Sequence, residues 1–218
     1  MTSATLQTLE TPPHDDAVVL VVDDDQALRQ ALGSLFRSVG MAVRLYGSAA
    51  DLLADGLPDS PCCLVLDVRL RGPSGLDLQA RLAQQGVQVP IIFMTGFGDI
   101  AMTVTAMKAG AEDFITKPFR DQDLLDAVSA ALDKSRARRD DSRRLDELRA
   151  CYQSLTAREA EVMGLAVRGL LNKQIAGEIG ISEVTVKIHR GQAMRKMKAR
   201  TFADLVMMAQ QLGVRAAG

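Results

Sequence analysis

Three consecutive carboxylates, Asp23, Asp24 and Asp25, directly follow the apolar run Val18–Val22. Like charges at this spacing repel one another, and each is costly to remove from water. A divalent cation resolves the conflict, because Mg²⁺ binds a few carboxylates together with water and phosphate oxygens. Asp25 has a simpler interpretation, as the N-cap of the helical pattern that follows it. Asp23 and Asp24 are therefore candidate Mg²⁺ ligands.

Other residues capable of chemistry stand at the ends of later apolar runs. Asp67 and Thr95 are the last residues of two such runs, and Lys117 and Pro118 follow a third. Taken singly, each would be interpreted as a turn or surface residue. If the runs are parallel strands, however, their carboxyl ends meet at one edge of a sheet, where ligands bind in such folds. Three carboxylates, a hydroxyl and an ammonium would then converge on one site.

The elements that must position these residues alternate along the first part of the chain. The apolar runs are AVVLVV (17–22), MAVRLY (41–46), CCLVLD (62–67), VPIIFMT (89–95) and EDFIT (112–116). The segments between them carry apolar residues at helical spacing, as in the stripe Leu28, Leu32, Leu35 and Phe36. This alternation predicts an α/β fold, a doubly wound five-stranded parallel sheet with helices on both faces. Burial on both faces explains why the strands are continuously apolar.

Residues 17–133 resemble the receiver domain of two-component response regulators. The resemblance rests on four motifs: VVDDD at the first strand, LVLDVRLRGPSG around Asp67, FMTGFGD around Thr95, and AMKAGAEDFITKPF ending at Phe119. Each motif alone would be a weak indication, but their combination is highly specific.

The resemblance implies a role for each residue at the sheet edge. Asp67 would accept a phosphoryl group from a sensor histidine kinase. Asp23 and Asp24 would hold Mg²⁺ together with Asp67, and the backbone carbonyl of Arg69 would complete the protein ligands. The physical logic agrees, because a carboxylate that attacks phosphorus needs its charge and that of the phosphate offset, here by Mg²⁺ and the Lys117 ammonium.

Three further expectations concern residues near this site. Thr95 can donate a hydrogen bond to a phosphoryl oxygen. The resemblance implies that Phe114 is an aromatic switch that turns inward when Thr95 moves. The alternative role for Phe114 is plain core packing. The resemblance also implies a cis peptide bond before Pro118 that directs Lys117 inwards. The chain departs from the family where Pro is common, four residues after the acceptor, because that position is Arg71.

The net charge of −1 conceals an uneven distribution along the chain. Residues 1–132 contain nine basic and 17 acidic residues, a net charge of −8. The next 18 residues have a net charge of +2, and residues 151–218 have +5. An acidic first part and a basic last part indicate two domains with different partners, and a small basic domain favours nucleic acid.

We therefore divide the chain into four parts. They are a disordered tail at 1–16, a receiver domain at 17–133, a charged helical linker at 134–153 and a DNA-binding domain at 154–218. The linker contains no Pro or Gly, and the alternative is a solvated charge run with partial helicity.

The last part has a purely helical pattern. Thr156 and Glu159 form a capping box, Asn172 is expected to cap the second helix, and Ser182 the third. Gly169 and Gly180 are suitable helix ends. A short helix, a three-residue turn and a longer basic helix predict a helix-turn-helix unit. The alternative is an ordinary small helical domain with a solvated basic face.

The third helix of this unit, expected after the Ser182 cap, separates into two faces at about 100° per residue. Val186, His189, Ala193 and Met197 lie on the side expected to face the core. The opposite face mixes aliphatic and basic residues: Val184, Lys187, Ile188, Gly191 and Arg195. Such a face suits a major groove, since Lys can donate to guanine and aliphatic carbons can contact the thymine methyl.

We assign DNA contacts to residues of this helix and the preceding one. They are Lys173, Val184, Thr185, Lys187, Ile188, Arg190, Gly191, Arg195 and Lys198. Lys173, Arg190 and Lys198, together with Arg200, are better placed for phosphate contacts than for base edges. His189 has no Cys or acid at ligand spacing and is interpreted as a packed or phosphate-contacting residue rather than a metal ligand.

Residues 154–212 closely resemble the LuxR-type DNA-binding domain, through LTAREAEV, GLLNKQIAGEIGISEVTVKIHR, MRKM and ADLV. Joined to the receiver domain, the whole chain resembles the FixJ/NarL class of transcriptional response regulators, and FixJ-like and StyR-like members above all. This implies a regulator without enzymatic turnover of its own. Its expected partners are a sensor histidine kinase, double-stranded promoter DNA, a second copy of the chain after phosphorylation, and RNA polymerase.

The composition excludes several other classes. The chain of 218 residues has no Trp and 4% aromatic residues, which argues against an aromatic-lined ligand pocket. Three Cys, two of them adjacent, fit neither a metal site nor a disulfide framework, so we expect a cytoplasmic protein. No signal peptide or membrane-spanning run is visible, so no membrane partner is expected.

Two alternatives remain open at this stage. A Mg²⁺-dependent aspartyl-phosphate phosphatase would carry its nucleophile in an Asp-x-Asp turn after the first strand, whereas the candidate acceptor here follows the third strand. A one-component regulator that senses a small ligand would not need the set formed by Asp23, Asp24, Asp67 and Lys117.

Overall fold

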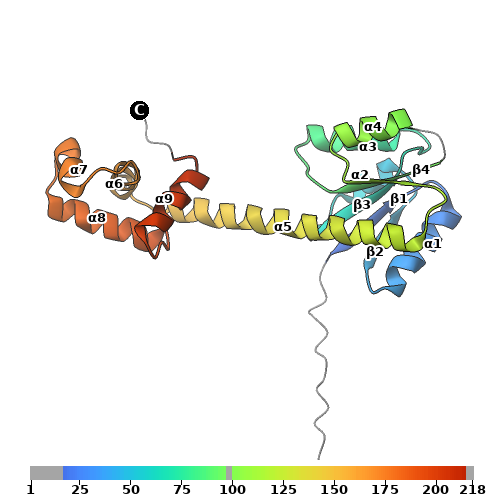
Figure 1. Cartoon of the computed structure of the whole chain (residues 1–218), viewed down its shortest axis with the longest axis horizontal. Coiled ribbons are helices and arrows are strands. Elements are labelled where there is room, and N and C mark those ends of the chain that lie inside the picture. The colour runs from blue at the N-terminus through green and yellow to red at the C-terminus, as the bar shows by residue number, and fades with distance from the viewer. Residues whose placement is uncertain (1–16, 97–99, 215–218) are drawn as a thin grey trace, which may run out of the picture. The chain divides into compact units, whose positions relative to one another are not determined.

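The structure is a computed structural model that describes residues 17–96 and 100–214 (Figure 1). The tail expected at 1–16 lies outside these residues, as do Phe97–Asp99 of the motif around Thr95. The chain divides into two compact units, one up to Arg138 and one from Arg139 onwards. No helix of the described ranges is long and apolar enough to cross a membrane.

The first unit is built on a five-stranded parallel sheet, which confirms the predicted fold. Its strands are β1 (Val18–Val22), β2 (Ala42–Tyr46), β3 (Cys62–Asp67), β4 (Ile91–Thr95) and β5 (Asp113–Thr116). They lie in the order β2-β1-β3-β4-β5, and every neighbouring pair is parallel. The three central strands are almost completely buried, while β2 and β5 at the edges have exposed positions.

Helices cover both faces of the sheet, as Figure 1 shows. They are α1 (Gln26–Ser38), α2 (Ala49–Asp55), α3 (Gly75–Gln84), α4 (Ile100–Lys108) and α5 (Asp121–Gln153). Leu32 and Phe36 of α1 pack with Leu124 and Val128 of α5 in one core. The helices α2, α3 and α4 contribute to the core on the opposite face. Alternate residues of each central strand point into these two cores, which is why the strands are apolar throughout.

The segment expected to be a linker, 134–153, lies within α5, a helix of 33 residues. Its beginning is fastened to the first unit, since the Ser135 hydroxyl accepts a hydrogen bond from the Cys62 backbone N–H (3.1 Å) and Lys134 pairs with Glu112 (2.7 Å). At its other end, Leu148 is buried in a core of the second unit. One end of the segment is therefore attached to the first unit by polar contacts, and the other end is part of a core of the second unit.

The second unit consists of the end of α5 and four further helices. These are α6 (Ala157–Val167), α7 (Asn172–Ile179), α8 (Glu183–Lys196) and α9 (Phe202–Gln211). Thr156 and Glu159 form the predicted capping box, and the Ser182 side chain caps α8. Gly180 ends α7 with φ +69°, a left-handed conformation that favours glycine.

One prediction about a helix end in this unit is wrong. Asn172 does not cap α7: the N-cap position is Leu171, whose backbone N–H bonds to the Gln174 side chain (2.8 Å), and Asn172 is the first helical residue. The Asn172 side chain instead accepts a hydrogen bond from Arg190. The helix α8 ends at Lys196, because Lys198 has φ +57° and cannot continue a right-handed helix.

A buried ion pair joins the start of α6 to the end of α8. The Lys196 ammonium lies 2.6 Å from a carboxylate oxygen of Glu159, and the Glu159 side chain is 4% exposed. The hydrogen bond from Lys196, followed by that from the Thr156 backbone N–H, lowers the pKa of Glu159 below its ordinary value. The ionised form of Glu159 is thus more stable in the folded protein than in the unfolded chain.

We expect this pair to make the stability of the second unit depend on pH. A carboxyl group with a lowered pKa contributes stability above its unfolded pKa and loses it as the pH falls through the folded pKa. Calorimetric unfolding of the full chain between pH 7 and about pH 3 should show a smaller drop in stability on acidification for Glu159→Gln than for the wild type. Lys196→Met should reduce the drop likewise, because it removes the main cause of the shift. An unchanged pH dependence in both variants would contradict this interpretation.

Candidate functional site

Three carboxylates lie together at the carboxyl edge of the sheet, as predicted. Asp23 follows β1, and Asp67 is the last residue of the neighbouring strand β3. Asp23 is completely buried, Asp67 is 9% exposed, and Asp24 is partly buried. One oxygen from each of the three lies within 4.8 Å of the others, a spacing that a single metal ion can bridge.

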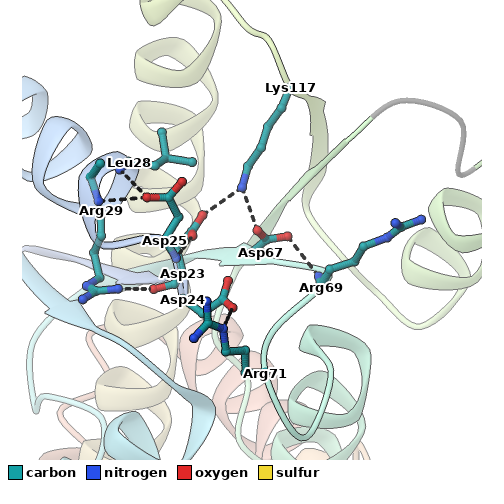
Figure 2. Close-up of polar contacts among 10 residues, drawn as sticks. Asp23, Asp24, Asp25, Leu28, Arg29, Asp67, Arg69, Arg71 and Lys117 are labelled. Atoms are coloured by element: carbon teal, nitrogen blue, oxygen red, sulfur yellow. Dashed lines mark hydrogen bonds and ion pairs between the residues drawn. The ribbon is translucent and has the colours of Figure 1, made fainter.

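The Lys117 ammonium joins two of these carboxylates (Figure 2). Its Nζ lies 2.8 Å from Asp23 Oδ2 and 2.7 Å from Asp67 Oδ2. The pKa of Asp23 is raised above its ordinary value, because burial has a larger effect than the opposing hydrogen bonds from Lys117 and the Asp25 backbone. Burial alone would lower the pKa of Lys117, but the hydrogen bonds to Asp23 and Asp67 outweigh it, so this pKa is raised and the ammonium stays charged. The Lys117–Pro118 peptide bond is cis, as the resemblance implied.

Backbone groups fix the orientation of both carboxylates. The Asp25 N–H donates to Asp23 Oδ1 (2.8 Å), and the Arg69 N–H donates to Asp67 Oδ1 (2.9 Å). Arg29 of α1 also donates to the backbone carbonyl of Asp23. Each carboxylate oxygen has more than one lone pair, so these hydrogen bonds leave the oxygens able to bind a cation as well. Asp25 itself caps α1 through its side chain, as predicted.

Thr95, at the end of β4, is 1% exposed. Its Oγ1 is buried and has no hydrogen-bond partner in the part of the chain that the structure describes. A buried hydroxyl without a partner is unfavourable, so it needs an explanation at this position. Its neighbours are the strands that end in Asp67 and lead into Lys117. An acceptor atom entering the site would satisfy it.

Phe114 lies on β5, next to Phe93 of β4 in the strand register. The side chain is partly buried and packs against the core on the α3 side of the sheet. It also lines a surface pocket of about 640 Å³ beside β5 and the start of α5, together with Pro118, Phe119 and Arg120. Phe114 thus contacts both the core and an open surface.

Two features of the site were not foreseen from the sequence. Arg71 forms an ion pair with Asp24, its Nε lying 2.9 Å from Oδ2. Figure 2 shows its side chain reaching back to Asp24, whereas the Arg69 side chain points away from the carboxylates. The other feature is Gly75, because a Cβ at this position would lie 2.4 Å from the Asp67 carbonyl oxygen. The last glycine of the motif around Asp67 was the sequence feature that could have indicated this close approach.

In the second unit, α8 presents the two faces that its sequence predicted. Val186, Ala193 and Met197 are buried. Val184 and Ile188 are 69% and 53% exposed although both are aliphatic. The remaining residues of the outward face, Lys187, Gly191 and Arg195, are exposed as well. An exposed aliphatic pair between basic residues is unusual for a surface that contacts only water.

The flanks of this face differ in how firmly their side chains are held. Lys173 on α7 is exposed, as is Lys198 beyond the end of α8. Arg190 is partly buried: its guanidinium donates to Asn172 (3.2 Å) and stacks over the Phe202 ring at 4.3 Å from the ring centre. These contacts connect α8 to α7 and α9, and they hold Arg190 in one orientation.

Comparison with known proteins finds a family match for each of two parts of the chain. Residues 19–129 match the response regulator receiver domain, and residues 153–209 match the LuxR family of bacterial regulatory proteins. Nodulation protein W of Bradyrhizobium diazoefficiens is 54% identical over 206 residues, which cover 94% of this chain and 91% of that protein. Response regulator protein TodT of Pseudomonas putida is 48% identical, over 90% of this chain and 86% of its own.

Among solved structures, the response regulator StyR superposes with a TM-score of 0.82 and 46% identity, covering 89% of this chain and 98% of StyR. The receiver fold, the helical second unit and the relatives agree on one family. The chain belongs to the two-component response regulators that join a receiver domain to a LuxR-type DNA-binding domain, alongside FixJ, StyR and TodT, and it acts in transcriptional regulation.

Proposed function

We propose that the chain regulates transcription in response to phosphorylation of Asp67 by a sensor histidine kinase. The observation that carries the proposal is the site at the sheet edge. Asp67 lies at the end of β3, and its charge is offset by Lys117 at 2.7 Å. The buried hydroxyl of Thr95, at the end of the neighbouring strand, has no hydrogen-bond partner among the described residues. A phosphoryl group on Asp67 would supply the acceptor that Thr95 lacks.

A divalent cation fits the same residues. Asp23, Asp24 and Asp67 offer hard oxygen ligands within 4.8 Å of one another, and the backbone carbonyl of Arg69 is the fourth ligand we propose. When bound, Mg²⁺ would offset negative charge on the transferring phosphoryl group. Receiver domains generally bind Mg²⁺ at such an acidic pocket.

The residues of the chain have separate roles in the transfer. An oxygen of Asp67 forms a bond to phosphorus while the bond between phosphorus and the donor nitrogen breaks, and the donor histidine leaves with that electron pair. Lys117 then interacts with the new phosphoryl oxygens as well as with Asp23. The hydroxyl of Thr95 donates a hydrogen bond to one of these oxygens, and this draws Thr95 towards the site.

The two alternative functions have less support. A phosphatase of the Asp-x-Asp type needs an acid/base carboxylate two residues from its nucleophile, and here that position is Arg69. A small-ligand sensor would not explain Lys117 held between two buried carboxylates. FixJ, one of the relatives, is named a transcriptional regulatory protein.

Asp67→Asn tests the acceptor. The amide is nearly isosteric, so the variant should fold as the wild type does. We expect no phosphoryl adduct by intact-protein mass spectrometry after incubation with acetyl phosphate and Mg²⁺, because the nucleophilic carboxylate is absent. Asp25→Asn is the matched control: it removes a neighbouring carboxylate, keeps a good N-cap and should leave labelling intact. Labelling of Asp67→Asn at the wild-type rate would exclude Asp67 as the acceptor.

We further propose that phosphorylation promotes a dimer through α4, β5 and the start of α5. Thr95 and Phe114 lie on adjacent strands, so a shift of Thr95 can be followed by Phe114 turning inward and changing this surface. The surface includes residues 106–110 and the beginning of α5 at Asp121. Val104 and Met107 on α4 are each 46% exposed, which leaves apolar area available for a partner. The dimer would bind promoter DNA and contact RNA polymerase.

Met107→Glu tests this surface. A charge in the centre of an apolar contact should shift the phosphorylated protein towards monomer, because the carboxylate would have to be desolvated. The measurement is the molar mass by sedimentation equilibrium, with and without phosphodonor. Val39→Glu is the control, since Val39 is similarly exposed (49%) but follows α1. If the wild type remains a monomer at full phosphate occupancy, or if both variants dimerise equally well, the proposed surface is wrong.

The outward face of α8 is proposed to enter the major groove. Lys187 and Ile188 lie at its centre and would contact base edges, with Val184, Thr185, Gly191 and Arg195 around them. Lys173 and Lys198 would contact phosphates. Arg190 keeps donors beyond its bond to Asn172, so it can bind a phosphate while it also connects the helices.

Two substitutions that remove the same charge test these assignments: Lys187→Ala removes the proposed base contact, and Lys173→Ala removes a proposed phosphate contact. Loss of the base contact should weaken specific binding by about 1–3 kcal/mol and relax the preference at one base pair. Loss of the phosphate contact should weaken all sequences alike and reduce the salt slope by about one unit. Affinities for a selected duplex and a random duplex across a salt series distinguish the two. The assignment is reversed if Lys173→Ala alone changes the base preference.

A further inference from the structure

In the described residues, the ion pairs of the acidic site join three carboxylates to two cations, one of them partly buried and the other exposed. Lys117 pairs with Asp23 and Asp67, and its side chain is 23% exposed. Arg71 pairs with Asp24, and its side chain is 90% exposed. Among the ion pairs of the described residues, Asp24 is thus neutralised by Arg71 and not by Lys117 (Figure 2).

The loop that carries Arg71 is held close to the site by its own backbone. It connects β3 to α3, and the N–H of Gly75 donates to the carbonyl of Val68 (3.0 Å), which closes the loop at its base. Gly72, the residue after Arg71, has φ +98°, a turn that suits glycine. A capping box between Ser74 and Asp77 fixes the start of α3. Arg71 is therefore attached to a short, anchored loop next to Asp24.

The ion pair and a bound Mg²⁺ need the same carboxylate. Asp24 is one of the three residues whose oxygens converge on the site, and its Oδ2 already faces the Arg71 guanidinium at 2.9 Å. A metal ion that coordinates Asp24 must either displace the Arg71 guanidinium or bind next to its positive charge. Both weaken the binding of the metal ion. Because Arg71 is exposed, the ion pair is weak enough to be displaced.

We propose that Arg71 is a tethered cation that competes with Mg²⁺ for Asp24 and so raises the Mg²⁺ concentration at which the site fills. The inference rests on the proposed metal site and adds a residue that sets its affinity. Arg71 holds Asp24 in place when the metal is absent. Lys117 cannot take this role, because it pairs with the two more deeply buried carboxylates.

Arg71→Gln tests the inference through direct Mg²⁺ binding. The full chain is titrated with MgCl₂ at constant ionic strength, and backbone amide NMR shifts in the two loops that follow β1 and β3 give the dissociation constant. Removal of an exposed ion pair should lower this constant about two- to fivefold. Arg71→Lys keeps the charge and should remain close to the wild type. Arg81→Gln, which removes the same charge from the last turn of α3, should have no effect.

The same titration on Asp24→Asn separates two kinds of failure. We expect Asp24→Asn to bind Mg²⁺ more weakly, and we expect Arg71→Gln to bring no gain in the Asp24→Asn background, since the competing pair no longer exists. If Asp24→Asn weakens binding but Arg71→Gln binds no better than the wild type, only the role of Arg71 is overturned. If Asp24→Asn binds Mg²⁺ as well as the wild type, or if the wild type does not bind it, the metal site itself is wrong and this inference fails with it.

Discussion

The position of Lys117 between Asp23 and Asp67 is the interaction on which the rest of the receiver site depends. Two carboxylates this deeply buried would be strongly unfavourable without a cation, and an uncompensated charge at such a place typically costs about 3–5 kcal/mol. Lys117 removes that cost with one ammonium that reaches both groups. It does not pair with the third carboxylate that converges there, Asp24, whose charge must be offset by another cation. The remaining charge is taken by Arg71 in the structure and by Mg²⁺ in the proposed reaction.

The fold supplies this interaction because parallel strands in register end at the same level. Val22 pairs with Leu66, so the residues that follow them, Asp23 and Asp67, emerge side by side. Thr95 pairs with Thr116, which brings Lys117 to the same edge. The ends of β1, β3, β4 and β5 all contribute groups to the site. Moving such a group along its strand by one residue would turn it to the other face of the sheet.

Much of this arrangement could be predicted from the sequence, because continuous apolar runs indicate buried strands, and a period of 3.6 residues indicates helices and their faces. The apolar runs located all five strands, and the faces of α8 followed from angular spacing alone. Side-chain pairing across loops has no such period. The pairing of Arg71 with Asp24 depends on how a short loop folds back, and the bond from Arg190 to Asn172 depends on how two helices pack. The division into domains and the DNA contacts remain predictions.

The central claim is that the charges at the sheet edge are arranged for a divalent cation. A crystal structure of the full chain grown with Mn²⁺, which replaces Mg²⁺ and marks its own position by anomalous scattering, tests it most directly. We predict one anomalous peak coordinated by carboxylate oxygens of Asp23, Asp24 and Asp67. Lys117 should remain in place, and the Arg71 guanidinium should be displaced from Asp24. A map with no peak among the three carboxylates, and with Arg71 still on Asp24 at saturating Mn²⁺, would contradict the account.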